Sequence, residues 1–118
     1  MKILVIEDEP SMRELIQRAL QKERFVVETA ATFFDAEDKI ELYDYDCVLL
    51  DIMLPDSFDL KLLYELLSLN KEARIVINSA INKPEITREA LIAGARGFIT
   101  KPFNEVDFLC KIKMALED

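Results

Sequence analysis

Five short apolar segments, separated by stretches with helical periodicity, constrain the fold of this chain more than any other feature of its sequence. The segments are four to six residues long, which is typical of β-strands, and they cover residues 2–7, 25–30, 46–51, 74–78 and 97–100. The first, third and fourth are nearly continuous in Ile, Leu and Val, as in parallel strands that are buried on both faces. The second alternates in part and the fifth is short, which favours the edges of a sheet. The pattern predicts an α/β fold: a single, doubly wound, five-stranded parallel sheet with five helices and right-handed crossovers.

The segments between the strands carry apolar residues at helical spacing. Pro10 is tolerated at the start of the first helix, and Ser11 with Glu14 predicts a capping box there. Pro84 is expected to open the fourth helix and Gly94 to close it. The stripes expected on the first and last helices are Met12, Leu15, Ile16, Ala19 and Leu20, and Val106, Leu109, Ile112 and Leu116, respectively.

The third helix is unusually apolar because it carries two stripes instead of one. Leu60, Leu63, Tyr64 and Leu67 form one stripe, and Leu62, Leu66 and Leu69 form the second. One stripe can face the sheet, and we expect the second to remain exposed. The second stripe is then a candidate contact with a partner or with another copy of the domain.

Length and composition indicate one acidic domain. A chain of 118 residues is expected to form a single domain over residues 1–118, and a hydrophobic fraction of 51% supplies enough core. The net charge of -8 and the pI of about 4.6 argue against direct contact of this domain with nucleic acid. Cys47 and Cys110 lie in apolar runs and are expected to be core residues. Lys2 leads directly into a short strand, so we expect no signal peptide or membrane span and a reduced, cytoplasmic, soluble domain.

Charged residues follow three of the predicted strands on the side where an open parallel sheet binds its ligands. Glu7 and Asp8 follow the first strand, Asp51 ends the third, and Lys101 follows the fifth. Three clustered carboxylates repel one another, so they need a bound dication or strongly raised pKa values. A lysine opposite such a cluster suits a doubly charged phosphoryl group. The combination indicates metal-assisted phosphoryl transfer.

Four motifs occur in order along the whole chain: IEDEP near the start, LLDIMLPD in the middle, INSA after the fourth strand and GFITKPF near the end. Each motif alone is weakly specific, but the four in register resemble the receiver domains of two-component response regulators. The resemblance implies a flavodoxin-like sheet of order 2-1-3-4-5, consistent with the central and edge strands. The switch point of that order lies between the first and third strands, where Asp8 and Asp51 emerge.

The resemblance implies a phosphorylation site that contains a metal ion. Asp51 corresponds to the phosphoacceptor, a carboxylate nucleophile that forms an acyl phosphate. Glu7 and Asp8 correspond to the acidic pair that holds Mg²⁺, with Asp51 and the carbonyl group of Met53 as further ligands. Such a domain catalyses only its own phosphorylation and dephosphorylation, so it is not expected to be an enzyme with a separate substrate.

The resemblance also implies a conformational switch. Lys101 would pair with a phosphoryl oxygen, Ser79 would donate its hydroxyl group to the phosphoryl group, and Phe98 would change rotamer as Ser79 moves. These movements would bias the face formed by the fourth helix, fifth strand and fifth helix, which the family uses for dimerisation or effector contact.

The partners that the resemblance implies are a sensor histidine kinase, docked on the first helix, and a second copy of the domain. Direct contact with nucleic acid or a membrane is not expected. The expected output is transcription regulation through a C-terminal DNA-binding domain outside this chain.

Four positions depart from the family pattern. Asp59 stands where many members have glycine and Phe58 where a small or acidic residue is usual, so the loop after Asp51 is expected to differ in shape. Arg96 and Gly97 replace two acidic residues of a frequent winged-helix subgroup. The charge pattern of that subgroup's dimer is therefore in doubt for this chain.

Other functions are compatible with the fold. A flavodoxin-type FMN site needs a hydroxyl- and glycine-rich loop after the first strand, whereas residues 7–10 of this chain are anionic. An aspartyl phosphatase would carry a second acid two residues after Asp51, where Met53 stands, and a nucleotide-binding enzyme would need more than 2 glycines. A metal-free pseudo-receiver that acts purely as a binding module is the main alternative. Taken singly, each charged residue could also be an ordinary helix cap, turn residue or surface charge.

Overall fold

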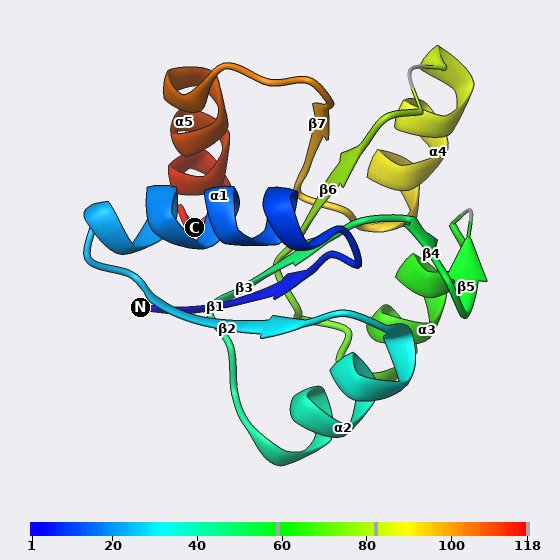
Figure 1. Cartoon of the computed structure of the whole chain (residues 1–118). Coiled ribbons are helices and arrows are strands. Elements are labelled where there is room, and N and C mark those ends of the chain that lie inside the picture. Colours follow the sequence, from blue (N-terminus) through cyan, green and yellow to red (C-terminus); the bar gives the residue numbers. More distant parts are fainter. Residues whose placement is uncertain (59, 82, 118) are drawn as a thin grey trace.

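The computed structural model describes residues 1–58, 60–81 and 83–117 and contains a five-stranded sheet flanked by helices (Figure 1). The strand order is β2-β1-β3-β6-β7, and all neighbouring pairs are parallel. These are the five predicted strands, so the predicted order 2-1-3-4-5 is confirmed. The elements are β1 (Lys2–Ile6), α1 (Pro10–Lys22), β2 (Val26–Ala30), α2 (Phe33–Leu42), β3 (Cys47–Leu50), β4 (Met53–Leu54), β5 (Ser57–Phe58), α3 (Lys61–Leu69), β6 (Ile75–Ser79), α4 (Pro84–Ala93), β7 (Gly97–Thr100) and α5 (Glu105–Ala115).

Two short strands, β4 and β5, pair in antiparallel fashion directly after β3. The apolar pattern does not predict this hairpin, because two residues per strand are too few to show a period. Pro55 and Asp56 form its tip. Asp59 lies outside the described residues and the side chain of Phe58 is not described, so their effect on the loop stays a prediction.

Helices cover both faces of the sheet and leave the carboxyl ends of the strands free. In Figure 1, α1 and α5 lie on one face and α2 and α3 on the other. Successive residues of β1 point to opposite faces. Ile3 and Val5 pack in the core beneath α1 and α5, whereas Leu4 and Ile6 pack in the core beneath α2, α3 and α4.

The buried faces of α1 and α5 differ in part from the predicted stripes. In α1, Ile16 and Leu20 are buried as predicted, but Leu15 is 55% exposed. In α5, Val106 is 74% exposed and Phe108 is completely buried. The α1 stripe was predicted too wide, because Leu15 lines a groove between α1 and α5 instead of the core. The α5 stripe was misplaced, because Phe108 and not Val106 lies on the buried side of the helix.

Glu9, not Ser11, caps helix α1. Its carboxylate accepts hydrogen bonds from two amides of the first turn, at 3.1 and 2.6 Å. Glu14 forms an ion pair with Arg18 (2.5 Å) instead of completing a capping box. The predicted capping box is wrong because Pro10, whose φ suits the first helical position, already starts the helix and places the cap one residue before it.

The predicted limits of the fourth helix are confirmed. Pro84 occupies the first turn of α4, and Gly94 ends the helix with a φ of 128°. This φ is sterically costly for residues that carry a Cβ atom. A Cβ at Gly94 would also lie 3.3 Å from a methyl carbon of Leu67, so α3 and α4 approach each other closely at this point.

The hypothesis that α3 exposes a second apolar stripe is wrong. Leu62, Leu63 and Leu66 are all buried, whereas Tyr64 and Leu69 are exposed. Helix α3 packs against α2 as well as the sheet, and leucines from both predicted stripes belong to one core. Leu62 and Leu66 are therefore not available to a partner.

The two cysteines lie in different environments. Cys47 is buried in β3 as predicted, but Cys110 is exposed on α5. The prediction for Cys110 is wrong because this residue lies one helical turn after the exposed Val106, on the outward side of α5. None of the helices in the described part of the chain has the length and apolar character needed to cross a membrane.

Candidate functional site

The ends of β1 and β3 place two predicted acids side by side. The amide of Glu7 donates to the carbonyl oxygen of Ala30 at the end of β2 (2.9 Å), and the amide of Asp51 donates to the carbonyl oxygen of Ile6 (3.0 Å). These bonds continue the ladder of the sheet one residue beyond each strand. The backbones of both acids are therefore anchored to the neighbouring strands by hydrogen bonds.

Glu7, Asp8 and Asp51 form an acidic cluster, as predicted. One carboxylate oxygen from each lies within 4.8 Å of the others. Glu7 and Asp51 are 2% and 6% exposed, whereas Asp8 is exposed. Lys101, at the end of β7, donates from Nζ to Oε1 of Glu7 and to Oδ2 of Asp51 (3.0 Å). Lys101 therefore pairs with the two buried carboxylates of the cluster.

Burial and the neighbouring charges shift the pKa values of Glu7 and Lys101. Burial raises the pKa of Glu7, and the charge of Asp51 raises it further, although the hydrogen bond from Lys101 opposes both effects. Burial lowers the pKa of Lys101, but its hydrogen bonds to Glu7 and Asp51 outweigh this effect and leave the pKa raised. Lys101 thus stays charged at neutral pH beside Glu7 and Asp51.

The two oxygens of Asp51 have different partners. Oδ1 accepts a hydrogen bond from the amide of Met53 (2.9 Å), and Oδ2 accepts from Lys101 (3.0 Å). Met53 begins strand β4, and its side chain is 52% exposed at the rim. The loop after β3 therefore holds the Asp51 carboxylate in one orientation.

Arg13 and Glu9 support the site, although the sequence did not single them out. The guanidinium group of Arg13 donates to the carbonyl oxygens of Glu7 (3.0 Å) and Asp8 (3.3 Å). The amide of Glu9 donates to Oε2 of Glu7 (3.2 Å). These bonds fix the loop between β1 and α1, which carries two of the three acids. No sequence signal marks this role of Arg13, because it depends on the path of the loop.

Ser79, at the end of β6, and Phe98, within β7, are both buried. The hydroxyl oxygen of Ser79 accepts a hydrogen bond from the amide of Ile81 (3.1 Å), and its carbonyl oxygen accepts from the amide of Lys101 (2.8 Å). Phe98 is 9% exposed and packs in the core beneath α4. The backbone of Ser79 is thus joined to the lysine of the site, whereas its hydroxyl group is engaged within its own loop.

The donor atoms of the acidic cluster suit a hard divalent cation. Mg²⁺ prefers carboxylate, carbonyl and water oxygens and is bound by few protein ligands. Glu7, Asp8 and Asp51 offer such oxygens close together, and two of these acids lie in a loop fixed by Arg13. Three carboxylates this close together repel one another, which favours a dication over a monovalent cation. The residues present therefore fit a magnesium ion.

Comparisons with known sequences agree with this arrangement. Residues 3–113 match the response regulator receiver domain family. The chain is 31% identical over 121 residues to the chemotaxis protein CheY of Treponema pallidum, and the alignment covers 98% of this chain and 83% of that protein. It is 36% identical over 117 residues to the transcriptional regulatory protein DltR of Streptococcus agalactiae, covering 97% of this chain and 51% of DltR. The chain thus spans about half the length of that regulator.

Solved structures show the same fold. The BeF3-activated N-terminal receiver domain of RstA from Klebsiella pneumoniae superposes with a TM-score of 0.91 at 28% identity, over 100% of both chains. A CheY-like response regulator receiver domain protein from Methanospirillum hungatei superposes with a TM-score of 0.90 at 32% identity, over 98% of this chain and 92% of that one. On the match over residues 3–113, this chain belongs to the family of response regulator receiver domains.

Proposed function

We propose that this domain is a phosphorylatable switch whose phosphoacceptor is Asp51. The observation that carries the proposal is the pairing of the buried Asp51 with Lys101, inside a cluster of acids that can hold a dication. An oxygen of the Asp51 carboxylate attacks phosphorus, and the bond from phosphorus to the leaving group breaks. The leaving group is the imidazole nitrogen of a phosphohistidine or, in vitro, acetate from acetyl phosphate. The product is an acyl phosphate.

The residues around Asp51 orient and stabilise this reaction. Met53 holds one carboxylate oxygen of Asp51 in place through its amide, and Lys101 can move from the other oxygen to an oxygen of the incoming phosphoryl group. Glu7, Asp8 and Asp51, with the carbonyl group of Met53, would hold Mg²⁺. Bound there, Mg²⁺ neutralises the charge of the phosphoryl group and lets a carboxylate approach it.

The switch would act through the loops after β6 and β7. Phosphorylation adds about two negative charges and three strong acceptor oxygens at the rim. We expect the Ser79 hydroxyl group to move toward Asp51 and donate to these oxygens, which would leave space for Phe98 to change rotamer. Because the Ser79 carbonyl already accepts from the Lys101 amide, the two loops would move together. The face formed by α4, β7 and α5 is the proposed surface for dimerisation or effector contact.

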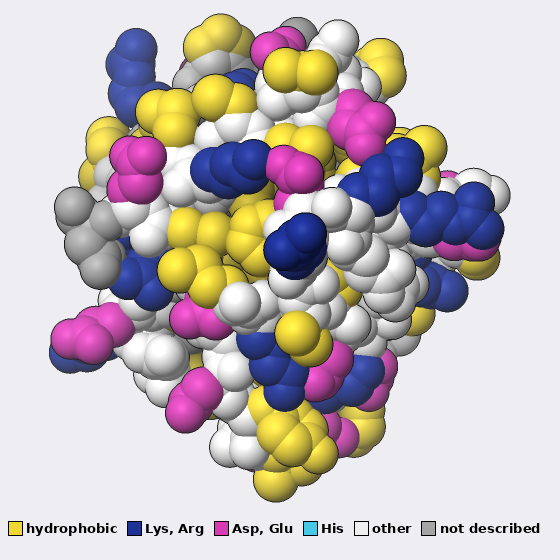
Figure 2. Space-filling model, turned by 90° about the vertical axis from the view of Figure 1, so that its left-hand side faces the viewer, with side chains coloured by type: hydrophobic (Ala, Val, Ile, Leu, Met, Phe, Trp, Pro, Cys, Tyr) yellow, Lys and Arg dark blue, Asp and Glu magenta, His cyan; other side chains and the backbone are white. Residues whose placement is uncertain are grey.

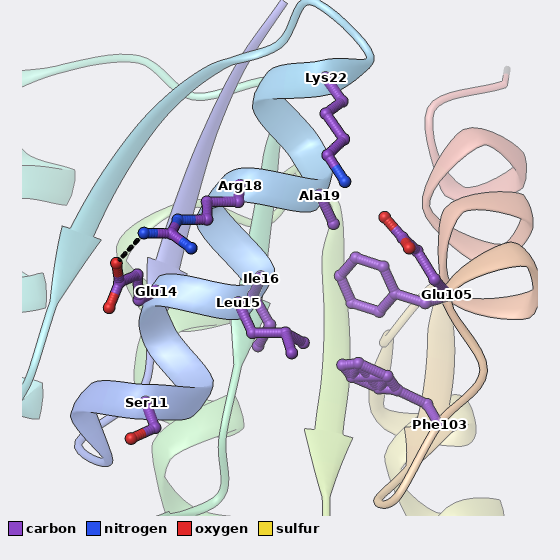
Figure 3. A pocket seen from close by; sticks show the side chains of 10 residues that line it. Ser11, Glu14, Leu15, Ile16, Arg18, Ala19, Lys22, Phe103 and Glu105 are labelled. Carbon is purple, nitrogen blue, oxygen red and sulfur yellow. Dashed lines mark hydrogen bonds and ion pairs between the residues drawn. The ribbon is translucent and has the colours of Figure 1, made fainter.

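The groove between α1 and α5 is the proposed docking site for a histidine kinase. It is a depression of about 450 Å³. Figure 3 shows Leu15 of α1 and Phe103 of the β7–α5 loop pointing into it, with the ion pair of Glu14 and Arg18 on the outer side of α1. An apolar groove with a charged rim fits the apolar face of an amphipathic helix. Helix α1 starts two residues after Asp8, so a helix seated there can present its phosphohistidine to the rim.

Docking can be tested separately from chemistry. Leu15→Asp should slow phosphotransfer from a phosphorylated kinase and leave phosphorylation by acetyl phosphate unchanged. Leu42→Asp, at a site on α2 that is 73% exposed, is the matched control and should affect neither reaction. Equal phosphotransfer to wild type and Leu15→Asp would contradict the proposed docking site.

The output would be regulatory and not enzymatic. Phosphorylation and dephosphorylation would occur only on the domain itself, without a separate substrate. The similarity to DltR supports transcription regulation, in which a further domain would contact DNA. On the face drawn in Figure 2, Lys and Arg side chains alternate with Asp and Glu instead of forming one basic patch. Together with the net charge of -8, this supports a domain that does not itself bind nucleic acid.

The first experiment is intact mass spectrometry after incubation with Mg²⁺ and acetyl phosphate. We expect one added phosphoryl group on wild type, none on Asp51→Asn, and none on wild type when Mg²⁺ is chelated. If wild type shows no adduct, a beryllofluoride titration separates rapid hydrolysis from a metal-free pseudo-receiver. Absence of beryllofluoride binding would favour the pseudo-receiver.

A further inference from the structure

The tip of the β4–β5 hairpin is tied to the start of helix α2 by a single carboxylate. Oδ1 of Asp56 accepts a hydrogen bond from the amide of Phe33 (2.9 Å), and Oδ2 accepts from the amide of Phe34 (3.0 Å). The next amide of the helix, that of Asp35, donates to Oγ1 of Thr32 (3.1 Å). The first three amides of α2 are thus capped, two of them by a residue more than 20 positions away in sequence.

The strand order makes this contact a bridge beside the acidic cluster. Helix α2 follows β2 and the hairpin follows β3, while β1 lies between these two strands. A bond from the hairpin to the start of α2 therefore spans the end of β1, where Glu7 and Asp8 are located. At the other end of the same short hairpin, the amide of Met53 holds Oδ1 of Asp51. Hydrogen bonds at the two ends of the hairpin thus connect it to Asp51 on one side and, through Asp56, to the start of α2 on the other.

The charge of Asp56 suits this position. Although Asp56 is exposed, some desolvation raises its pKa, but the hydrogen bonds from the Phe33 and Phe34 amides outweigh this effect and leave the pKa below its usual value. The amino end of a helix carries partial positive charge, which also favours a carboxylate. Asp56 is therefore ionised at neutral pH and can hold both amides at once.

We infer that Asp56 is a positioning residue for the phosphoacceptor loop: by fastening the hairpin to α2, it fixes the backbone of Met53 against Asp51 and the metal-binding acids. The inference rests on the proposed function, because the Met53 carbonyl matters as a metal ligand only if the cluster binds Mg²⁺. The plain alternative is that Asp56 only caps α2. In that case its loss would destabilise the helix and leave the loop unchanged.

Two variants separate these roles. Asp56→Ala removes both acceptors and frees the hairpin, whereas Thr32→Ala removes a cap from the same helix end without touching the hairpin. Titration calorimetry with Mg²⁺ alone should show a dissociation constant raised at least about threefold in Asp56→Ala and unchanged in Thr32→Ala. Hydrogen exchange at the Met53 amide should be about tenfold faster in Asp56→Ala only. Equal effects of the two substitutions, or no effect of Asp56→Ala, would overturn the inference.

A third variant tests whether the charge of Asp56 acts directly on the cation. Asp56→Asn removes the same charge as Asp56→Ala but keeps one acceptor oxygen for α2. We expect its Mg²⁺ affinity and Met53 exchange to lie between wild type and Asp56→Ala, and identical losses of Mg²⁺ affinity in both variants would overturn the positioning role. If wild type binds no Mg²⁺, the proposed function fails, and exchange at the Met53 amide still decides whether Asp56 holds the loop.

Discussion

Replacing Asp51 by Asn should not destabilise the metal-free protein, although Asp51 is buried and paired with a lysine. At an effective dielectric constant of about 20, the attraction across the 3.0 Å between Lys101 Nζ and Asp51 Oδ2 is about 5.5 kcal/mol. Oxygens of Glu7 and Asp8 lie within 4.8 Å of an Asp51 oxygen, so each ionised carboxylate repels Asp51 by at least about 3.5 kcal/mol on the same scale. The two repulsions together exceed the attraction, but solvent weakens the share of the exposed Asp8. The Coulombic effects of Asp51 therefore nearly cancel.

Desolvation then decides the sign of the change. Asp51 is 6% exposed, and burial of a carboxylate costs more free energy than burial of an amide. Asn has nearly the same shape and keeps an oxygen that can accept from the Met53 amide. We expect Asp51→Asn to raise the free energy of unfolding by between zero and about 1.5 kcal/mol in the absence of metal. For a domain of this size, that corresponds to an increase in Tm of up to about 6 °C.

Mg²⁺ should reverse the order of stability. A ligand that binds only the folded state stabilises it by about 1.4 kcal/mol at ten times its dissociation constant. Wild type should gain this free energy. Asp51→Asn has lost one of three carboxylates of the site and should gain clearly less.

Urea unfolding with EDTA and with increasing Mg²⁺ measures both effects. Asp38→Asn, on an exposed position of α2, is the matched control for the change in net charge and should behave as wild type. If Asp51→Asn lost the roughly 3 to 5 kcal/mol that removal of one partner from an isolated buried ion pair costs, the near-cancellation of attraction and repulsion at Asp51 would be refuted. Equal stabilisation of both proteins by Mg²⁺ would refute the assignment of Asp51 as a metal ligand.

Three further predictions concern the site and the core. Lys101→Met removes the only cation bonded to the carboxylates of Glu7 and Asp51 among the described residues. Urea unfolding in EDTA should therefore show a loss of about 3 to 5 kcal/mol in the free energy of unfolding, and Mg²⁺ should restore part of it. Burial raises the pKa of Cys47 to about 12, whereas Cys110 is exposed. Ellman's reagent at pH 8 should therefore titrate one thiol per native chain and two after unfolding. Reaction of two thiols in the native protein would contradict the described core. Phe108→Ala should cost about 3 to 5 kcal/mol by thermal unfolding because the ring is completely buried, and a loss below 1 kcal/mol would show that α5 packs differently.

The strands and the acidic cluster could be predicted because both depend on short-range patterns. Apolar runs bounded by turn residues identify strands, and parallel strands in an α/β fold end on the same side of the sheet. Glu7, Asp51 and Lys101 each follow such a run, so their proximity follows from the strand order alone. No knowledge of helix packing is needed for this step.

The buried face of each helix was harder to predict, because neighbouring helices decide it. Residues two positions apart on a helix are separated by about 200°, so Val106 and Phe108 cannot share one buried stripe. Both are apolar, and the sequence does not show which of them faces the sheet. The same ambiguity affected α3, where contact with α2 as well as the sheet buries Leu62 and Leu66 in addition to Leu63.

Supporting polar residues escaped prediction for a different physical reason. Asp is common in tight turns and Arg is a good helix former, so Asp56 in a turn and Arg13 in a helix have sufficient local reasons to occur. A residue whose local preferences explain its presence gives no sign of a contact far along the chain. Glu7 and Asp51 are different, because an acid that must be buried at the end of an apolar strand is unfavourable without a compensating partner. The sequence therefore reveals residues that are locally unfavourable and function directly, whereas the residues that hold them in place emerge only from the three-dimensional contacts.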